Sequence, residues 1–202
     1  MKKCLIIGRP NAGKTLFMLN FAQYLGFKNI KIKFQSHDCE MKMEEYIIEI
    51  AKEKLSSSTP YKTTCLQSIA LDFPVFKGKK TVEILDSSGL IDGIHNNIQI
   101  RRAMGQTLAA IKESDLILHI IDVSNLVMGN LLEMIGKVDY ELAQYGLIKE
   151  GYVILGNKID LLENKTPIIR LQKEFPNHYI IPISALTKQG FSEVKTYVSR
   201  RL

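Results

Sequence analysis

Short apolar runs bounded by turn residues recur along the chain. They read CLIIG, SIALDFPVF, TVEILD, LILHIID, YVILGN and YIIPIS. Most segments between them space their apolar residues as a helix does, and this alternation is typical of a mainly parallel sheet with helices on both faces. The pattern therefore predicts an α/β fold with a mixed, mostly parallel sheet of about six strands.

Local signals add detail to this order of elements. Only residues 77–79 separate two of the runs, and Gly78 can adopt the positive φ of a tight turn, which predicts an antiparallel hairpin. Thr166 is expected to cap a helix that has Pro167 at its first position. A last helix is expected over 191–202.

The length and composition suit one domain. The chain has 202 residues, and 46% of them are apolar, which is enough for a substantial core. No apolar run approaches the roughly 18 residues that span a bilayer, and the first run is interrupted too soon for a signal peptide. We therefore expect a cytoplasmic protein with no integral membrane segment.

The basic excess indicates an anionic partner without identifying it. The formal net charge is +6 and the isoelectric point is about 9.1. Lysine clusters at 28–33 and 77–80 hold much of the excess, and each is either a solvated edge or an RNA contact. The three cysteines have no paired spacing, which predicts neither a disulfide framework nor a zinc site, although His37 and Cys39 could share a metal ion.

The segment GRPNAGKT directly follows the first apolar run. A strand, a loop of the form G-x-x-x-x-G-K-T and a helix together predict a phosphate-binding P-loop. In such a loop backbone N–H groups face an anion, Lys14 reaches the β- and γ-phosphates, and the Thr15 hydroxyl can bind Mg²⁺. The expected nucleotide-binding residues of this loop are Gly8, Asn11, Ala12, Gly13, Lys14 and Thr15.

A second motif, NKID, follows the run YVILG. Its residues Asn157, Lys158 and Asp160 would lie at the carboxyl end of a strand, where a doubly wound sheet binds its ligand. The Asp160 carboxylate can accept hydrogen bonds from N1–H and the exocyclic amine of guanine, whereas adenine has no such pair of donors. The motif therefore predicts GTP and GDP as ligands rather than ATP.

Two weaker motifs gain meaning from their place. DSSG follows the run TVEIL, so Asp86 can hold Mg²⁺ and the Gly89 N–H can contact a γ-phosphate. SAL follows the final run, and its backbone N–H groups can bind the guanine carbonyl. The expected base-binding residues there are Ser184, Ala185 and Leu186.

The series GRPNAGKT, TT, DSSG, NKID and SAL resembles the five motifs of Era/Obg-like GTPases, which belong to the translation-factor-related class of P-loop proteins. The segment DSSGLIDGIH in particular is similar to that of the Obg family. The resemblance implies that Thr64 is the second Mg²⁺ ligand, with Thr63 as the alternative. It makes Lys14, Thr64 and Gly89 the candidate catalytic residues.

Leu90 stands where small signalling GTPases carry a glutamine that orients water. An aliphatic side chain cannot hydrogen-bond water, so slow intrinsic hydrolysis is expected. The resemblance implies that Asn11 coordinates K⁺ and that K⁺ stimulates hydrolysis; the alternative is that Asn11 only suits a turn. Arg101 and Arg102 are either fingers for a neighbouring subunit or solvated residues of a helix.

The number of sequence positions between Lys14 and Thr64 is about twice the number expected between the corresponding motifs of a compact Era-type domain. This predicts an inserted helical segment at about 36–60. An amphipathic helix is expected over 39–55, either packed on its own domain or serving as a docking element. The resemblance also implies an additional RNA-binding or glycine-rich domain, for which 202 residues leave no room.

We therefore expect residues 1–202 to form one G domain that hydrolyses GTP as a Mg²⁺-dependent switch. Its expected partners are a guanine nucleotide, a protein activator or effector, and the ribosome or RNA. The alternatives are a nucleotide-gated binding module with negligible hydrolysis and an adaptor recruited to ribosomes or anionic membranes by its lysines. The sequence leaves the oligomeric state open.

Overall fold

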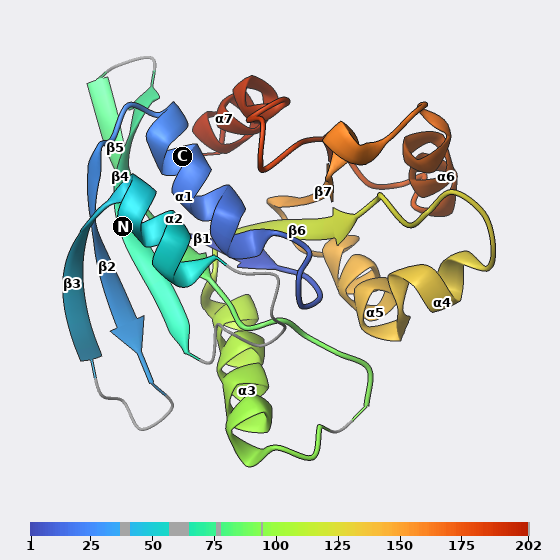
Figure 1. Ribbon diagram of the computed structural model, residues 1–202, viewed down its shortest axis with the longest axis horizontal. Helices are drawn as coiled ribbons and strands as arrows, with labels where there is room; N and C mark the ends of the chain where they lie inside the picture. The colour runs from blue at the N-terminus through green and yellow to red at the C-terminus, as the bar shows by residue number, and fades with distance from the viewer. Residues whose placement is uncertain (37–40, 57–64, 76–77, 94, 202) are drawn as a thin grey trace.

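The structure is a computed structural model, which describes residues 1–36, 41–56, 65–75, 78–93 and 95–201 (Figure 1). One sheet runs through it in the strand order β3-β2-β4-β5-β1-β6-β7-β8. The strands are β1 Lys2–Ile7, β2 Asn29–Gln35, β3 Met41–Ile47, β4 Leu66–Val75, β5 Gly78–Asp86, β6 Leu116–Asp122, β7 Tyr152–Asn157 and β8 Ile180–Pro182. The predicted α/β class is confirmed, and the described sheet has two more strands than expected.

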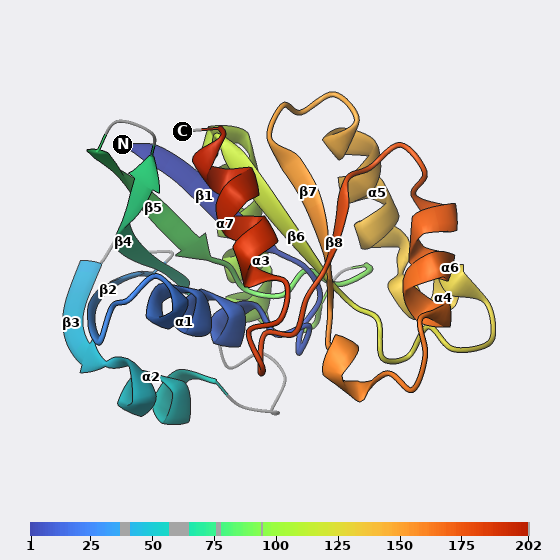
Figure 2. The same cartoon turned by 90° about the horizontal axis from the view of Figure 1, so that it is seen from above.

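Helices cover both faces of the sheet (Figures 1 and 2). They are α1 Lys14–Tyr24, α2 Ile48–Leu55, α3 Ile98–Glu113, α4 Leu131–Ile135, α5 Lys137–Gly146, α6 Thr166–Glu174 and α7 Phe191–Ser199, with a 3₁₀ turn η1 at Ile159–Leu161. Buried residues of α1, α2 and α7 share one apolar core, and those of α3, α4, α5 and α6 share the other. Every helix in the described part of the chain is too short or too polar to cross a membrane.

Strand β1 shows how the sequence builds these two cores. Side chains of a strand alternate between the faces of its sheet. Cys4 and Ile6 enter the core under α1, while Leu5 and Ile7 enter the opposite core, and all four are fully buried. An uninterrupted apolar run is therefore what a central parallel strand requires.

The two additional strands, β2 and β3, come from the segment between α1 and α2. The expected helix over 39–55 is wrong in its first half, because residues 41–47 form β3 and helix α2 begins only at Ile48. Strand β2 pairs antiparallel with both β3 and β4, so a hairpin extends the sheet at its edge. The backbone hydrogen bonds of this ladder outweigh the weak helical spacing of Met43 and Ile47, both of which are exposed.

Helix α2 packs on its own domain. Ile48 and Ala51 are buried in the core beneath α1, and Lys52 donates a hydrogen bond of 2.8 Å to Gln23 of α1. In strand β2, the exposed Asn29 and Lys31 alternate with the buried Ile30 and Ile32, and Lys33 is half-buried. The lysine cluster at 28–33 thus includes the solvated face of a strand.

Smaller expectations have mixed outcomes. Strands β4 and β5 form the predicted antiparallel hairpin, and Gly78 has a φ of 95°. Thr166 is the first residue of α6 and not its N-cap, which is Lys165. The Thr166 N–H donates a hydrogen bond to the Asn164 side chain. The last helix, α7, ends at Ser199.

The parallel part of the sheet brings distant segments together. β1 pairs parallel with β5 and β6, and β7 pairs parallel with β6 and β8. Their carboxyl ends therefore share one edge of the sheet, where ligands bind in open α/β folds. The motifs GRPNAGKT, DSSG, NKID and SAL follow four of these strands.

Candidate functional site

The loop between β1 and α1 has a backbone that only certain residues tolerate. Gly8 has a φ of 142°, and a Cβ there would lie 2.2 Å from the carbonyl oxygen of Ile120. Asn11 adopts a left-handed φ of 62°, which asparagine tolerates better than most residues. Gly13, with a φ of 97°, precedes the first residue of α1. The loop thus turns sharply and ends on a helix N-terminus, the arrangement that binds anions.

Lys14 is folded against its own loop. Its Nζ donates hydrogen bonds to the carbonyl oxygens of Gly8 at 3.1 Å and Arg9 at 2.8 Å. Burial lowers the pKa of Lys14 to about 8, while the charges of Asp86 and Asp139 act to raise it. A buried ammonium of this kind gains from a nearby anion.

Asp86 and Thr15 meet beside Lys14. The Thr15 hydroxyl donates a hydrogen bond of 2.6 Å to Oδ2 of Asp86, which is fully buried. The other carboxylate oxygen, Oδ1, is also buried and has no hydrogen-bond partner among the described residues. Burial raises the pKa of Asp86 to about 6, whereas the Lys14 charge and the Thr15 hydrogen bond lower it.

The DSSG segment lies against the phosphate-binding loop. A Cβ at Gly89 would be 2.5 Å from the Pro10 nitrogen, so only glycine allows this approach. The Leu90 N–H donates to the Gly8 carbonyl at 3.2 Å. The Leu90 side chain is 2% exposed and packs in the core on the α5 face of the sheet, as expected for an aliphatic residue.

Asn157 connects three of the predicted motifs. Its side-chain amide donates to the carbonyl of Ala12 at 2.7 Å, and its Oδ1 accepts the N–H of Ala185 at 2.8 Å. Asn157 is 1% exposed, so both bonds are shielded from water. The first residue of NKID therefore fixes the phosphate loop and the SAL loop relative to each other.

Lys158 and Asp160 of NKID are more accessible than Asn157, whereas Ile159 packs against the core. Lys158 has a left-handed φ of 70° and forms an ion pair of 2.5 Å with Asp122 at the end of β6. Asp160 lies in the turn η1 and is exposed. An exposed carboxylate beside the buried Asn157 is free to meet a ligand base at this edge.

The SAL loop is held by buried polar contacts. Ser184 is fully buried, and its hydroxyl accepts the N–H of Thr187 at 3.0 Å. Ala185 is buried as well, while Leu186 is 64% exposed. Asn20 of α1, which sequence reasoning missed, donates to the Ala185 carbonyl at 2.7 Å. The signal was available, because Asn20 interrupts the apolar run LFMLNFA.

Four of the expected residues, Thr63, Thr64, His37 and Cys39, fall outside the described residues. Within the described ranges, no three His, Cys, Asp or Glu side chains gather as a metal cluster would require. Arg101 donates to the carbonyls of its own loop, at His95 and Asn96.

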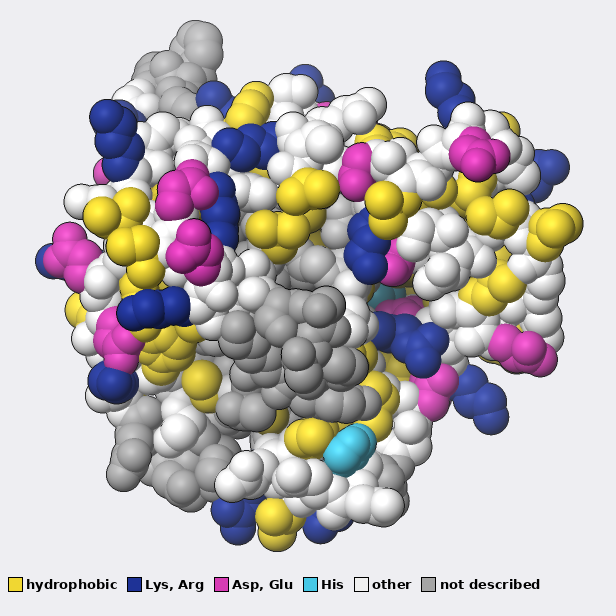
Figure 3. All heavy atoms as spheres, in the orientation of Figure 1, with side chains coloured by type: hydrophobic (Ala, Val, Ile, Leu, Met, Phe, Trp, Pro, Cys, Tyr) yellow, Lys and Arg dark blue, Asp and Glu magenta, His cyan; other side chains and the backbone are white. Residues whose placement is uncertain are grey.

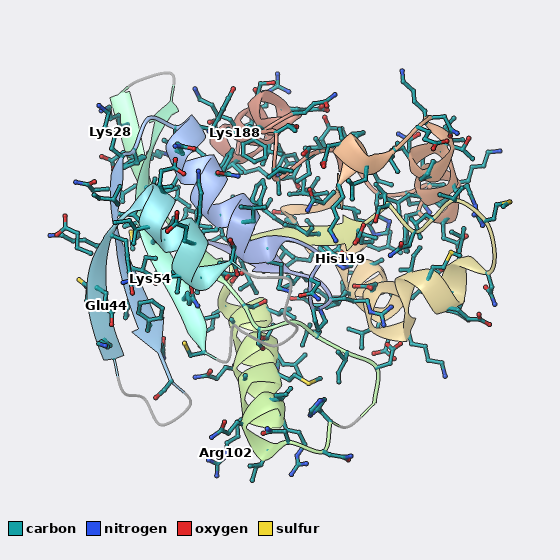
Figure 4. All side chains as sticks on the ribbon, viewed as in Figure 1. Lys28, Glu44, Lys54, Arg102, His119 and Lys188 are labelled. Carbon is teal, nitrogen blue, oxygen red and sulfur yellow. The ribbon has the colours of Figure 1, made fainter. Side chains whose placement is uncertain are left out.

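Figure 4 places Arg102 near the end of α3 that points away from the sheet. Arg102 is exposed there. On the face shown in Figure 3, basic side chains are interspersed with acidic ones. The described positive charges of this face therefore do not gather into one patch.

The strand, loop and helix around Lys14, the buried carboxylate of Asp86 and the NKID loop meet at one edge of the sheet. Such a fold and site define a P-loop GTPase domain. The sequence matches the family described as "50S ribosome-binding GTPase" over residues 45–158, more than half of the chain. The chain belongs to this family and resembles Era and Obg as expected. The matched span starts after the phosphate-binding loop, whose assignment rests on its own geometry.

Two relatives named GTPase Obg match nearly the whole chain. That of Persephonella marina is 29% identical over 193 residues, which cover 94% of this chain and 47% of the relative. That of Thermodesulfovibrio yellowstonii is 28% identical over 201 residues, which cover 98% of this chain and 50% of the relative. The chain thus spans about half the length of these curated relatives.

Solved structures support the fold. A crystal structure of Aquifex aeolicus Era bound to GDP·AlF₄⁻ has a TM-score of 0.66 and 21% identity, covering all of this chain and 57% of that one. Era in complex with MgGDPNP and nucleotides 1506–1542 of 16S ribosomal RNA has a TM-score of 0.68 and 20% identity, covering all of this chain and 56% of that one. At these identities the likeness concerns the fold alone.

Proposed function

We propose that the chain binds GTP and GDP with Mg²⁺ and hydrolyses GTP as a molecular switch, through one G domain of residues 1–202 with an inserted segment at about 36–60. The observation that carries the proposal is the buried Asp86 beside the Thr15 hydroxyl, with one carboxylate oxygen that has no hydrogen-bond partner among the described residues. A carboxylate and a hydroxyl are the ligands that Mg²⁺ accepts in nucleotide sites, and the bound ion neutralises phosphate charge.

The remaining roles follow from position. Backbone N–H groups of Gly8, Asn11, Ala12 and Gly13 would surround the phosphates with the Lys14 ammonium. Lys158, Asp160 and the SAL residues Ser184, Ala185 and Leu186 would bind the base, while Gly89 and Thr64 would report the γ-phosphate. Thr64 would also bind Mg²⁺, with Thr63 as the alternative.

Fluorescent GDP and GTP analogues test binding directly. We expect binding that weakens at least tenfold when EDTA removes Mg²⁺, and ATP that does not compete. In the Asp86→Asn variant, EDTA should no longer weaken nucleotide binding, because a neutral amide is a poor ligand for Mg²⁺. Tight binding of adenosine nucleotides, or indifference to guanosine nucleotides, would contradict the proposal.

Hydrolysis is proposed to be slow and stimulated by K⁺ through Asn11. Because the backbone of Asn11 is left-handed, the test needs a variant that keeps this conformation. Asn11→Gly does so and removes the whole side chain, including the amide oxygen that would bind K⁺. Single-turnover hydrolysis should be faster in KCl than in NaCl for the native chain and equal in both for Asn11→Gly. Equal rates for the native chain would remove the K⁺ hypothesis.

A binding module with negligible hydrolysis is the second candidate. The burial of Leu90 favours it, since this side chain offers no hydrogen bond to an attacking water. Phosphate release in KCl, with and without ribosomal particles, separates the two functions. A rate indistinguishable from that of Lys14→Ala under every condition would favour the module.

Ribosomal particles or their RNA are the proposed partner. The family description and the Era complex with 16S ribosomal RNA support this class of partner. We expect the chain to sediment with ribosomal particles in a nucleotide-dependent way, and a protein activator would accelerate hydrolysis. Sedimentation that is equal with GDP and a GTP analogue would argue for charge attraction alone.

A further inference from the structure

Two charged side chains from the nucleotide loops converge on the junction of α4 and α5. Arg9, in the phosphate-binding loop, donates from Nη1 to the carbonyl oxygens of Met134 at 3.2 Å and Ile135 at 3.0 Å. These carbonyls lie in the last turn of α4. The last carbonyls of a helix have no partner within it. The guanidinium therefore satisfies a helix C-terminus.

Asp92 makes the complementary contact from the segment after DSSG. Its carboxylate accepts the N–H of Lys137 at 3.1 Å and of Val138 at 2.7 Å, the first two residues of α5. A carboxylate at this position both caps the helix and complements its dipole. Asp92 is three residues after Gly89, the residue proposed to meet the γ-phosphate.

Both contacts meet at Gly136, the buried residue between the two helices. A Cβ there would lie 2.9 Å from Nη1 of Arg9 and 3.0 Å from Oδ2 of Asp92, and its φ of 96° also favours glycine. We call Arg9, Asp92 and Gly136 the α4–α5 clasp. A cavity of about 340 Å³ opens beside it, between the phosphate loop and α5, and both Ile91 and Ile135 line it.

Apolar side chains are exposed on α4 and in the loop ahead of it. Leu132 of α4 is 45% exposed, and Val127 and Met128 of the loop are 49% and 80% exposed. Figure 3 shows apolar side chains on the side of the molecule where Figure 1 places α4. The inner side of α5 is fixed, because the buried Asp139 bonds to His119 of β6 at 2.8 Å. Movement at the clasp would therefore shift α4 more readily than the body of α5.

We propose that Arg9 and Asp92 are positioning residues that couple the nucleotide loops to α4, so that α4 responds to the bound nucleotide in addition to Thr64 and Gly89, which are proposed to report the γ-phosphate. The proposal rests on guanine nucleotide binding. When the γ-phosphate holds Gly89, the position of Asp92 changes, and α4 adjusts because the clasp connects them. By thermodynamic linkage, cutting the clasp also alters the relative affinity for GTP and GDP.

A single tryptophan tests the coupling, because the chain has none of its own. Leu132→Trp places the reporter on α4, and Ile148→Trp, at an 82% exposed position beyond α5, is the control reporter. We expect the emission of the α4 reporter to differ between GDP and a non-hydrolysable GTP analogue and that of the control to stay equal. Equal emission at α4, with both nucleotides bound, overturns the proposal.

The clasp variant is Asp92→Ala in the Leu132→Trp background. The difference in tryptophan emission between the GDP and GTP-analogue states should disappear. The ratio of GTP to GDP affinity should shift by about twofold to tenfold. The matched control is Asp115→Ala, which removes another exposed carboxylate that accepts a backbone N–H, that of Lys3 at 2.8 Å. It should change neither readout. If Asp92→Ala changed neither the affinity ratio nor the emission difference between nucleotide states, the coupling would be excluded.

Hydrogen exchange of the native chain needs no variant. The amides of Lys137 and Val138 should exchange at different rates in the two nucleotide states, because Asp92 caps them to a different extent. Equal protection would overturn the proposal even if Asp92→Ala failed to fold. Failure of the proposed function gives another result, since then neither guanine nucleotide binds.

Discussion

The side-chain amide of Asn157 donates a hydrogen bond of 2.7 Å to the carbonyl of Ala12, so the NKID loop is joined directly to the phosphate-binding loop. The same side chain accepts the Ala185 N–H. Residues of three loops, separated by most of the chain, are thereby held in one arrangement by a single buried amide. Asn157 therefore fixes the shape of the site through contacts within the protein, which do not require a bound base.

The first prediction concerns this amide. Asn157→Ala leaves the Ala12 carbonyl and the Ala185 N–H buried without partners, which should cost about 2 to 4 kcal/mol of unfolding free energy. GTP and GDP affinity should fall together, because the phosphate and base loops both lose their support. Urea denaturation and nucleotide binding measure the two effects. Asn164→Ala, at an exposed asparagine with one backbone bond, is the control and should cost under about 1 kcal/mol.

The second prediction concerns base selection by Asp160. Because this residue is exposed, Asp160→Asn should change the unfolding free energy by less than about 0.5 kcal/mol. GDP affinity should fall about 100-fold, since the amide presents a donor to a guanine that also donates. Xanthosine diphosphate, which has a carbonyl in place of the guanine amine, should bind the variant better than GDP does. Calorimetry with both nucleotides checks this, and unchanged GDP affinity would remove Asp160 from the base site.

The sequence alone predicted the positions of the motifs at the carboxyl ends of the strands better than it predicted the added strands β2 and β3. GRPNAGKT and NKID are contiguous, and their backbone demands, such as the left-handed Lys158, are encoded within a few residues. Strand β2 was missed because its alternation of Ile30 and Ile32 with lysines was interpreted as charge clustering. Its formation depends on pairing with β4, about 35 residues further along the chain, and local periodicity does not report such pairing.

The contacts that connect the motifs were also beyond the sequence. Nothing local indicates that Arg9 reaches the end of α4 or that Lys158 pairs with Asp122. The first contact joins the loop after β1 to α4, and the second joins the ends of β6 and β7, so neither can be predicted before the arrangement of the elements is known. Asn20 was the exception, as a single amide in an apolar helix normally has a buried partner.

The third prediction concerns pH. Burial raises the pKa of Asp86 from 3.8 to about 6, so the folded chain binds a proton there that the unfolded chain has released. The contribution of this group to the unfolding free energy therefore falls as pH rises from about 4 to about 6. Carbon-13 NMR of the Asp86 carboxyl group should show a midpoint near 6 without nucleotide. Mg²⁺ and GDP should move it lower, because a cation favours the carboxylate. A midpoint near the ordinary value would show that the carboxylate is hydrated.

The last prediction concerns Leu90, which occupies the position of the water-orienting glutamine of other GTPases. Leu90→Gln would appear to restore this glutamine, yet the side chain at this position is 2% exposed and packs in the core on the α5 face. A buried amide without partners should cost about 2 to 4 kcal/mol of unfolding free energy, which thermal or urea denaturation measures. Single-turnover GTP hydrolysis should not increase, because the amide would lie in the core and not beside the phosphates. Leu90→Met keeps the volume and apolar character and should lose under about 1.5 kcal/mol. A tenfold faster hydrolysis in Leu90→Gln would show instead that the segment leaves the core when GTP binds, and that Leu90 then faces the attacking water.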